Sequence, residues 1–211
     1  MLLPKIIIRY GFLLDPKFRE YFLLELENKD KILIENEELF KNIEDYKKEW
    51  KKHEDKILEA LLNLLPIKFI HNVIDVYVVS YLPGNSGISE PLIISGDLKT
   101  DRFIDVLVHE IIHVYLTNNN IIPKIFPFKI IDAMFPEEKD LKVKSHIIVH
   151  AIQKYILLDI LKDNNRYINN KEKFCLTESY KKSWDIVEER GYIEIINEFK
   201  NRIELSLKNK K

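Results

Sequence analysis

The sequence predicts an α+β fold that is mostly helical, with a small sheet placed before a central apolar helix. Strands are predicted over 73–81 and 91–95, whereas helical periodicity dominates much of the remaining chain. Strands and helices are therefore segregated along the sequence rather than alternating. This order favours α+β over a fold built from repeated strand–helix–strand units.

The first long element is predicted to be a helix over 35–65. Its apolar residues recur at spacings of three, four or seven, and Pro66 ends the pattern. These residues are Phe40, Ile43, Tyr46, Trp50, Ile57, Leu61 and Leu64.

Two strands are predicted next. Residues 73–81 (VIDVYVVSY) are rich in β-branched and aromatic side chains, which is typical of a strand. Residues 83–87 (PGNSG) predict a turn or loop. Residues 91–95 (PLIIS) predict a short strand, and the proline that opens it favours a place at the edge of the sheet.

A helix is predicted from 100 to about 116, with Thr100 or Asp101 as its cap. It is apolar on more than one face, and such a helix is usually buried. The proline-rich segment 121–140 is expected to be irregular.

The last part of the chain is predicted to be helical. One largely apolar helix covers 141–161, and two more cover 177–190 and 192–207, separated by Gly191.

The length of 211 residues indicates a single domain over 1–211. Within it we expect an N-terminal helical part over 1–70. The stretch 71–163 holds the sheet, a metal-binding helix and a third-ligand helix, and 164–211 holds the C-terminal helices.

The composition excludes several classes of partner. There are 33 basic and 34 acidic residues, so the net charge of −1 predicts no binding to nucleic acid. No apolar run reaches the 18 residues of a membrane span, so no membrane association is expected. Cys175 is the only cysteine and cannot form an internal disulfide, which favours a reducing cytoplasm.

The chemistry is concentrated in the motif HEIIH, which places His109, Glu110 and His113 inside the predicted buried helix. Residues four apart project from nearly the same face of an α-helix, so the two imidazoles can reach one metal ion. Glu110 follows the first ligand directly and can take a proton from a metal-bound water. Buried His and Glu without partners are costly, which argues against a purely structural role.

A catalytic zinc usually takes three protein ligands and leaves one position to water. The best source of the third is the motif HIIVH, in which His146 and His150 repeat the same spacing 33 and 37 residues after His113. One of the two could bind the metal while the other supports it by a hydrogen bond. Other candidates for the third ligand are Glu137, Glu138 and Glu178.

The segment HEIIHVYL resembles the active-site helix of the zincin metallopeptidases, and the preceding strands resemble their sheet. This resemblance implies a zincin-like domain, with His109 and His113 as Zn²⁺ ligands and Glu110 as general base. Leu116 and Asn119 stand where the metzincin extension requires glycine and histidine. The layout is closer to gluzincins, in which case His146 replaces their downstream glutamate and His150 takes the supporting place.

We therefore expect a zinc-dependent peptidase that acts on peptide or protein substrates through a metal-activated water. Residues that could stabilise the oxyanion are Tyr155, Tyr180, Tyr192 and His71. The alternative is a non-proteolytic zinc-binding or regulatory module in which all four histidines close the metal site. A di-iron carboxylate bundle requires a second ExxH, and Val143 and Ile147 occupy its glutamate positions.

Overall fold

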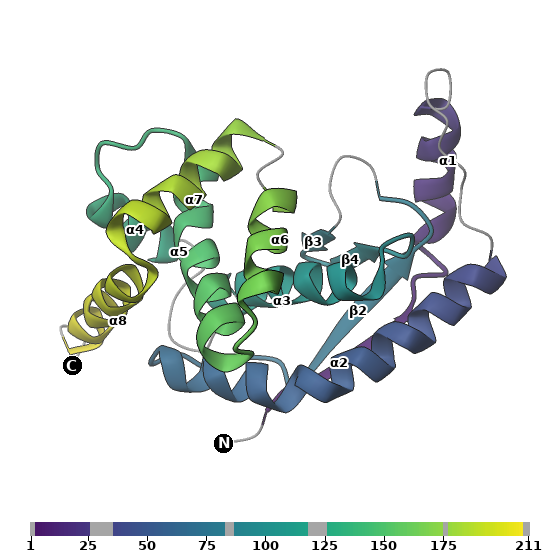
Figure 1. The fold of residues 1–211 in the computed structure, drawn as a ribbon, viewed down its shortest axis with the longest axis horizontal. Helices are drawn as coiled ribbons and strands as arrows, with labels where there is room; N and C mark the ends of the chain where they lie inside the picture. The colour runs from purple at the N-terminus through teal and green to yellow at the C-terminus, as the bar shows by residue number, and fades with distance from the viewer. Residues whose placement is uncertain (1–2, 26–35, 83–86, 118–125, 175–176, 209–211) are drawn as a thin grey trace. The chain divides into compact units, whose positions relative to one another are not determined.

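The computed structural model describes residues 3–25, 36–82, 87–117, 126–174 and 177–208. By their contacts the residues form two compact units, 1–55 with 71–111 and 56–70 with 112–211. The boundaries after residues 55 and 111 fall inside long helices. The elements confirm the predicted α+β class, with many helices and one small sheet (Figure 1).

The first unit contains a four-stranded sheet in the order β1-β2-β4-β3. β1 (Lys5–Tyr10) and β4 (Leu92–Ser95) both run parallel to β2 (Val73–Val79), whereas β3 (Gly87–Ser89) pairs antiparallel with β4. The alternating burial of β1 and β2 shows that one face of these strands is covered.

The strand predicted over 91–95 is present, but its expected place at the sheet edge is wrong. β4 is paired on both sides, by β2 and by β3. This is possible because Pro91 precedes the strand and so removes no hydrogen-bond donor from it. β3 lies at the edge instead. β1 falls within the stretch 1–70 expected to be helical, so the connection from β1 to β2 is a parallel crossover through helices.

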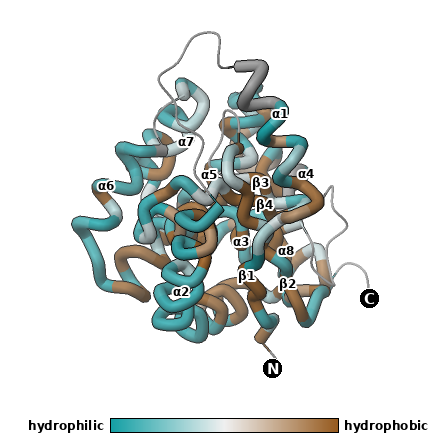
Figure 2. Tube along the Cα trace, turned by 90° about the vertical axis from the view of Figure 1, so that its right-hand side faces the viewer, coloured by the Kyte–Doolittle hydropathy of each residue, from teal (hydrophilic) through white to brown (hydrophobic). Residues whose placement is uncertain are grey.

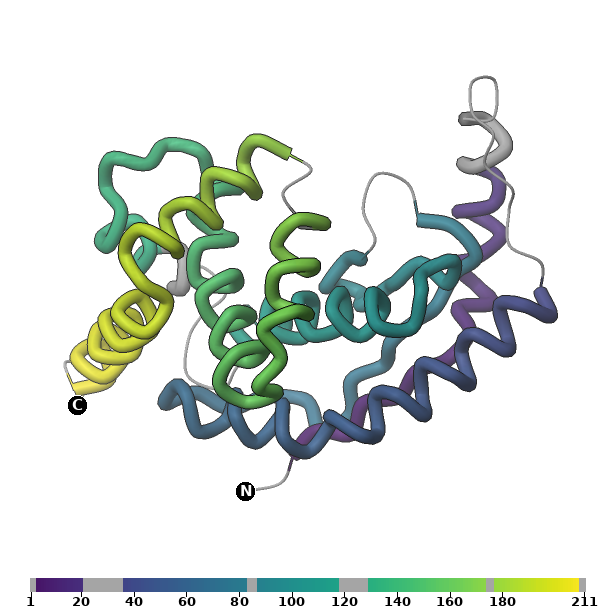
Figure 3. Tube along the Cα trace, in the orientation of Figure 1, coloured from purple at the N-terminus to yellow at the C-terminus, as the bar shows by residue number. Residues whose placement is uncertain are grey.

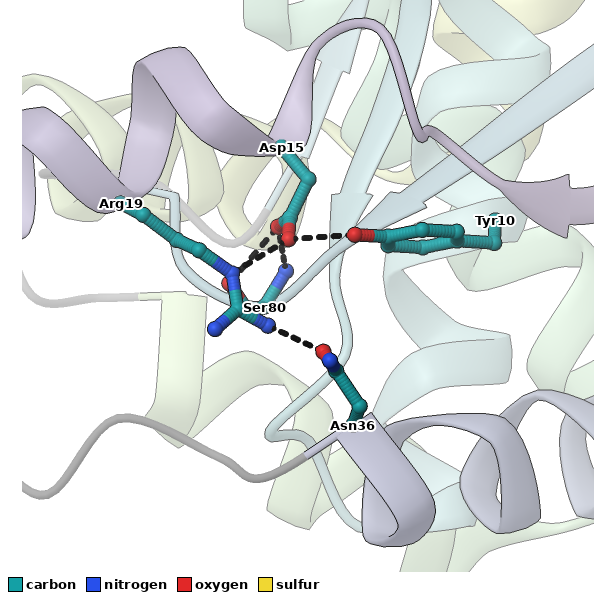
Figure 4. A network of polar contacts seen from close by, with 5 residues as sticks. All are labelled: Tyr10, Asp15, Arg19, Asn36 and Ser80. Atoms are coloured by element: carbon teal, nitrogen blue, oxygen red, sulfur yellow. Dashed lines mark hydrogen bonds and ion pairs between the residues drawn. The ribbon is translucent and has the colours of Figure 1, made fainter.

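A buried polar network joins β1, the end of β2 and the helix α1 (Asp15–Glu25), as Figure 4 shows. The carboxylate of Asp15 accepts hydrogen bonds from the hydroxyls of Tyr10 (2.8 Å) and Ser80 (2.6 Å), from the Ser80 amide and from Arg19 (2.6 Å). Arg19 also donates to Asn36 at 2.6 Å. The first turn of α1 is thereby tied to the carboxyl ends of two parallel strands.

The helix predicted over 35–65 is confirmed as α2 (Asn36–Leu64), which carries both hydrophilic and hydrophobic residues along its length (Figure 2). Its N-terminal part packs in the first unit. Tyr46 donates from its hydroxyl to the carbonyl of Gly96 at 2.9 Å, and its ring stacks on Phe103 with centroids 3.8 Å apart. Phe103 belongs to α3 (Thr100–Thr117), the predicted buried helix.

In the second unit, α5 (Leu141–Tyr155) packs against α7 (Glu178–Arg190) and α8 (Tyr192–Lys208). α5 continues as a short π-helix, η2 (Ile156–Ile160), and together they match the helix predicted over 141–161. The two predicted C-terminal helices are also confirmed. The chain reverses at Lys162, which takes a left-handed φ of 57°, and returns as a further helix (Figure 3).

That further helix, α6 (Asn164–Phe174), is not among the predicted elements. The prediction that 121–140 is irregular is also wrong in part, because α4 covers Phe126–Met134. Pro127 is the second residue of α4, where the first turn has no use for the missing N–H. Residues 118–125 of this segment lie outside the described residues, as does Cys175.

None of the described helices combines the length and the apolar character that crossing a membrane requires.

Candidate metal centre

Three of the predicted metal-ligating residues come together. Within the described residues, His109, His113 and His146 each offer one ligand atom, and these atoms all lie within 4.8 Å of one another. His109 and His113 are four residues apart on the single continuous helix α3. His146 comes from α5, and its ring centroid lies 5.0 Å from that of His113.

The orientation of His146 follows from a hydrogen bond to its own helix. Its Nδ1 lies 2.7 Å from the carbonyl oxygen of Lys142, which can only accept, so Nδ1 carries the proton and donates. In the neutral imidazole the lone pair is then on Nε2. This is the arrangement by which a carbonyl commonly orients a metal-binding histidine.

Two of the three histidines, His113 and His146, are held in the uncharged form that a metal requires. Burial, with a smaller contribution from His146, lowers the pKa of His113 to about 3. Burial likewise lowers the pKa of His146 to about 4, although its hydrogen bond to Lys142 opposes the shift. At neutral pH both imidazoles therefore present lone pairs rather than positive charges.

Glu110 is buried in α3 between the two histidines of its motif, and burial raises the pKa of its carboxyl to about 8. Among the described residues no hydrogen bond or ion pair to this carboxyl is present. A divalent cation beside it would favour the ionised form and lower its pKa. The side chain lies under β3, where a Cβ built on Gly87 would be 2.9 Å from both Cγ and Oε1 of Glu110.

His150 is placed differently from the other three histidines and does not belong to the set. Its Nδ1 lies 2.9 Å from Oγ of Ser183, and its ring stacks on Trp184 with centroids 4.3 Å apart. Ser183 donates its hydroxyl proton to the carbonyl of Tyr180 at 2.8 Å, so Nδ1 of His150 donates to Ser183. Burial, with smaller contributions from His146 and His113, places the pKa of His150 well below its usual range.

Of the other candidates from the sequence, one tyrosine borders the cluster of histidines, whereas another tyrosine and a glutamate are engaged in other contacts. Tyr180 packs edge-on against His146 with ring centroids 4.4 Å apart, so it borders the centre. Tyr192 donates instead to Asp159, and Glu138 pairs with Lys182. Neither Glu138 nor the other two glutamate candidates, Glu137 and Glu178, belongs to the described cluster of potential ligands.

Sequence reasoning missed the surroundings of the site. Ser183 and Trp184 lie 33 and 34 positions after His150, so no local pattern connects them. Gly87 falls in a segment predicted only as a turn. A glycine is ordinary in a turn, so nothing in the local sequence indicated that another element approaches it closely.

A search of protein families, curated proteins and solved structures finds no match to this chain. The site is therefore defined by its own geometry, as a candidate three-histidine metal centre with a buried glutamate beside it.

Proposed function

We propose that this protein is a zinc-dependent peptidase in which His109, His113 and His146 hold the metal and Glu110 is the general base. One observation carries the proposal: three imidazole donors converge within 4.8 Å, and the carboxyl next to the first of them is buried without a hydrogen bond from any described residue.

The donor set suits zinc. Neutral imidazoles are good ligands for Zn²⁺, and three protein ligands leave one coordination position for water or substrate. When bound, zinc supplies Lewis acidity, which acidifies water and polarises a carbonyl group. Site residues with strongly perturbed pKa values in a buried cluster are typical of catalytic centres.

Glu110 supplies the proton transfers. Its carboxylate accepts a proton from the water that attacks the peptide carbonyl and passes it to the nitrogen of the departing amine. The new C–O bond forms when the water attacks, and the C–N bond breaks once the nitrogen has received the proton, so the products are a free carboxylate and a free amine. The substrates are peptides or proteins.

The alternative, a closed four-histidine site in a non-proteolytic module, is less favoured by the geometry. His150 lies outside the set of convergent ligand atoms. A closed structural site also leaves the buried carboxyl of Glu110 without a role.

The test combines metal content with peptide cleavage. We expect about one zinc per chain by mass spectrometry and cleavage of a mixed peptide library, lost on chelation and restored by added zinc. A protein that binds no zinc after refolding in its presence contradicts the metal centre. Zinc at full occupancy without cleavage of any peptide contradicts the peptidase.

A further inference from the structure

Gly87, the first residue of β3, lies directly against the side chains of α3. A Cβ built on it would be 2.7 Å from Cγ1 of Val106 and 2.9 Å from both Cγ and Oε1 of Glu110. Carbon atoms in favourable contact are about 3.5–4.0 Å apart. The backbone of β3 therefore lies so close to α3 that any side chain at position 87 would clash with Val106 and Glu110.

Backbone conformation does not explain this glycine. Among the described glycines only Gly191 has a positive φ, so the backbone at Gly87 is accessible to other residues. What excludes a side chain is the space taken by Val106 and Glu110.

Neither the strand β3 nor the side chain of Glu110 can move away from this contact without losing other favourable interactions. Gly87 is paired with Ile94 of the buried strand β4, so moving β3 away from α3 breaks that pairing. Glu110 lies in the interior of α3, where the preceding helical turn restricts its rotamers. A methyl group at position 87 would therefore press on both Val106 and Glu110, and Glu110 is the one of the two that carries a carboxyl of the proposed site.

We propose that Gly87 is a positioning residue for Glu110: the absent side chain at the start of β3 leaves the space in which the carboxyl is held. The part of this inference that concerns catalysis rests on the peptidase function proposed above. The packing part does not, and it is tested separately.

The packing test is a double-mutant cycle in the zinc-loaded protein, with urea unfolding as the readout. All variants carry Val106→Ala, which removes the second contact that a methyl group at position 87 would meet. In that background we expect Gly87→Ala to raise the equilibrium constant for unfolding about tenfold, as overpacking does. Adding Glu110→Ala should remove most of that increase.

Gly11→Ala is the matched control, because the three atoms nearest to its Cβ would belong to Val79, Tyr77 and Val78, and none of these residues lies on α3. Its effect should be the same with and without Glu110→Ala. Equal effects of Gly87→Ala in both backgrounds would overturn the proposal. Failure of Gly87→Ala to fold, with recovery of folding by Glu110→Ala, would support it.

The catalytic readout uses Gly87→Ala in the otherwise unchanged protein. We expect zinc to remain at one per chain while kcat falls about a hundredfold, since a displacement near 1 Å can cost that much. Gly11→Ala should keep the rate of the unchanged protein. Full kcat in Gly87→Ala would overturn the positioning role, whereas an unchanged protein that cleaves nothing contradicts the peptidase and leaves the unfolding cycle to decide on Gly87.

Discussion

His146 and His150 have the same spacing on the same helix, yet their surroundings give them different chemistry. The Nδ1 of His146 is bonded to the carbonyl of Lys142, and this ring meets His113. The Nδ1 of His150 is bonded to Ser183, and this ring is stacked on Trp184. Because His146 and not His150 offers a ligand atom close to those of His109 and His113, we propose His146 as the third ligand, with His150 packed beside it.

Alanine substitutions of the four histidines should divide them into two groups. We expect His109→Ala, His113→Ala and His146→Ala to lose the metal, because each removes one of three donors. His150→Ala should retain about one zinc per chain by mass spectrometry, although it should unfold more easily. Loss of zinc from His150→Ala with a folded circular dichroism spectrum would show instead that His150 is a ligand.

Glu110→Gln separates metal binding from proton transfer. Glutamine keeps the size of the side chain but cannot accept the proton, so kcat should fall about 10²–10⁴-fold while zinc content is unchanged. Steady-state peptide cleavage and metal analysis on the same preparation measure both quantities. Activity close to that of the unchanged protein would remove Glu110 from the mechanism.

α5 is the element that carries His146 to α3, and its position is held by contacts at several points. Asp140 caps its first turn through the amides of Lys142 and Val143, and also accepts from Ser179 of α7 at 2.6 Å. Near the other end, Lys154 donates to Glu188 of α7 at 2.6 Å. Contacts of this kind make a helix a rigid support for a ligand.

Removing the cap should loosen α5. We expect Asp140→Ala to lower the melting temperature by about 2–4 °C, because both the cap and the bond to Ser179 are lost. Asp140→Asn keeps an acceptor and should lose less. Asp185→Ala, on an exposed position of α7, is the control and should change little by differential scanning calorimetry. Equal melting temperatures for Asp140→Ala and Asp185→Ala would contradict the role of the cap.

The stability of the first unit depends on the carboxylate of Asp15, which is completely removed from solvent. Burial alone would raise the pKa of Asp15, but hydrogen bonds from Ser80, Arg19 and Tyr10 outweigh it and lower that pKa below its ordinary value. The folded protein therefore binds this proton less readily than the unfolded chain does. The resulting stability is present above the unfolded pKa, about 3.9, and is lost as the pH falls through the folded pKa.

Asp15→Asn should reveal this dependence. At pH 7 we expect a loss of about 1–3 kcal/mol in the free energy of unfolding, because charged hydrogen bonds in a buried network are weakened. The difference from the unchanged protein should narrow as the pH falls below about 3.9. Urea unfolding at pH 7, 5 and 3 measures it, with the exposed Asp55→Asn as control. A difference that stays constant down to pH 3 would contradict the assignment to the Asp15 carboxylate.

Local pattern predicted the features that depend on near neighbours in the chain. The fourfold spacing of His109 and His113 places them on one face of α3 whatever packs around it. The period of apolar residues likewise located α2, α5, α7 and α8. α1 carries a weak periodic signal, and α6 is strongly polar although its apolar residues are periodic. β1 was missed although Pro4 and Gly11 flank it, which are residues that commonly bound a strand.

Contacts between residues that are far apart in the sequence could be identified only from the tertiary structure. The choice between His146 and His150 depends on Ser183 and Trp184, which reach α5 through helix packing rather than sequence spacing. The space above Glu110 depends on how closely β3 approaches α3 at Gly87. Helical periodicity is set by backbone geometry within a few residues, whereas these contacts arise from side-chain packing between elements, which no short segment encodes.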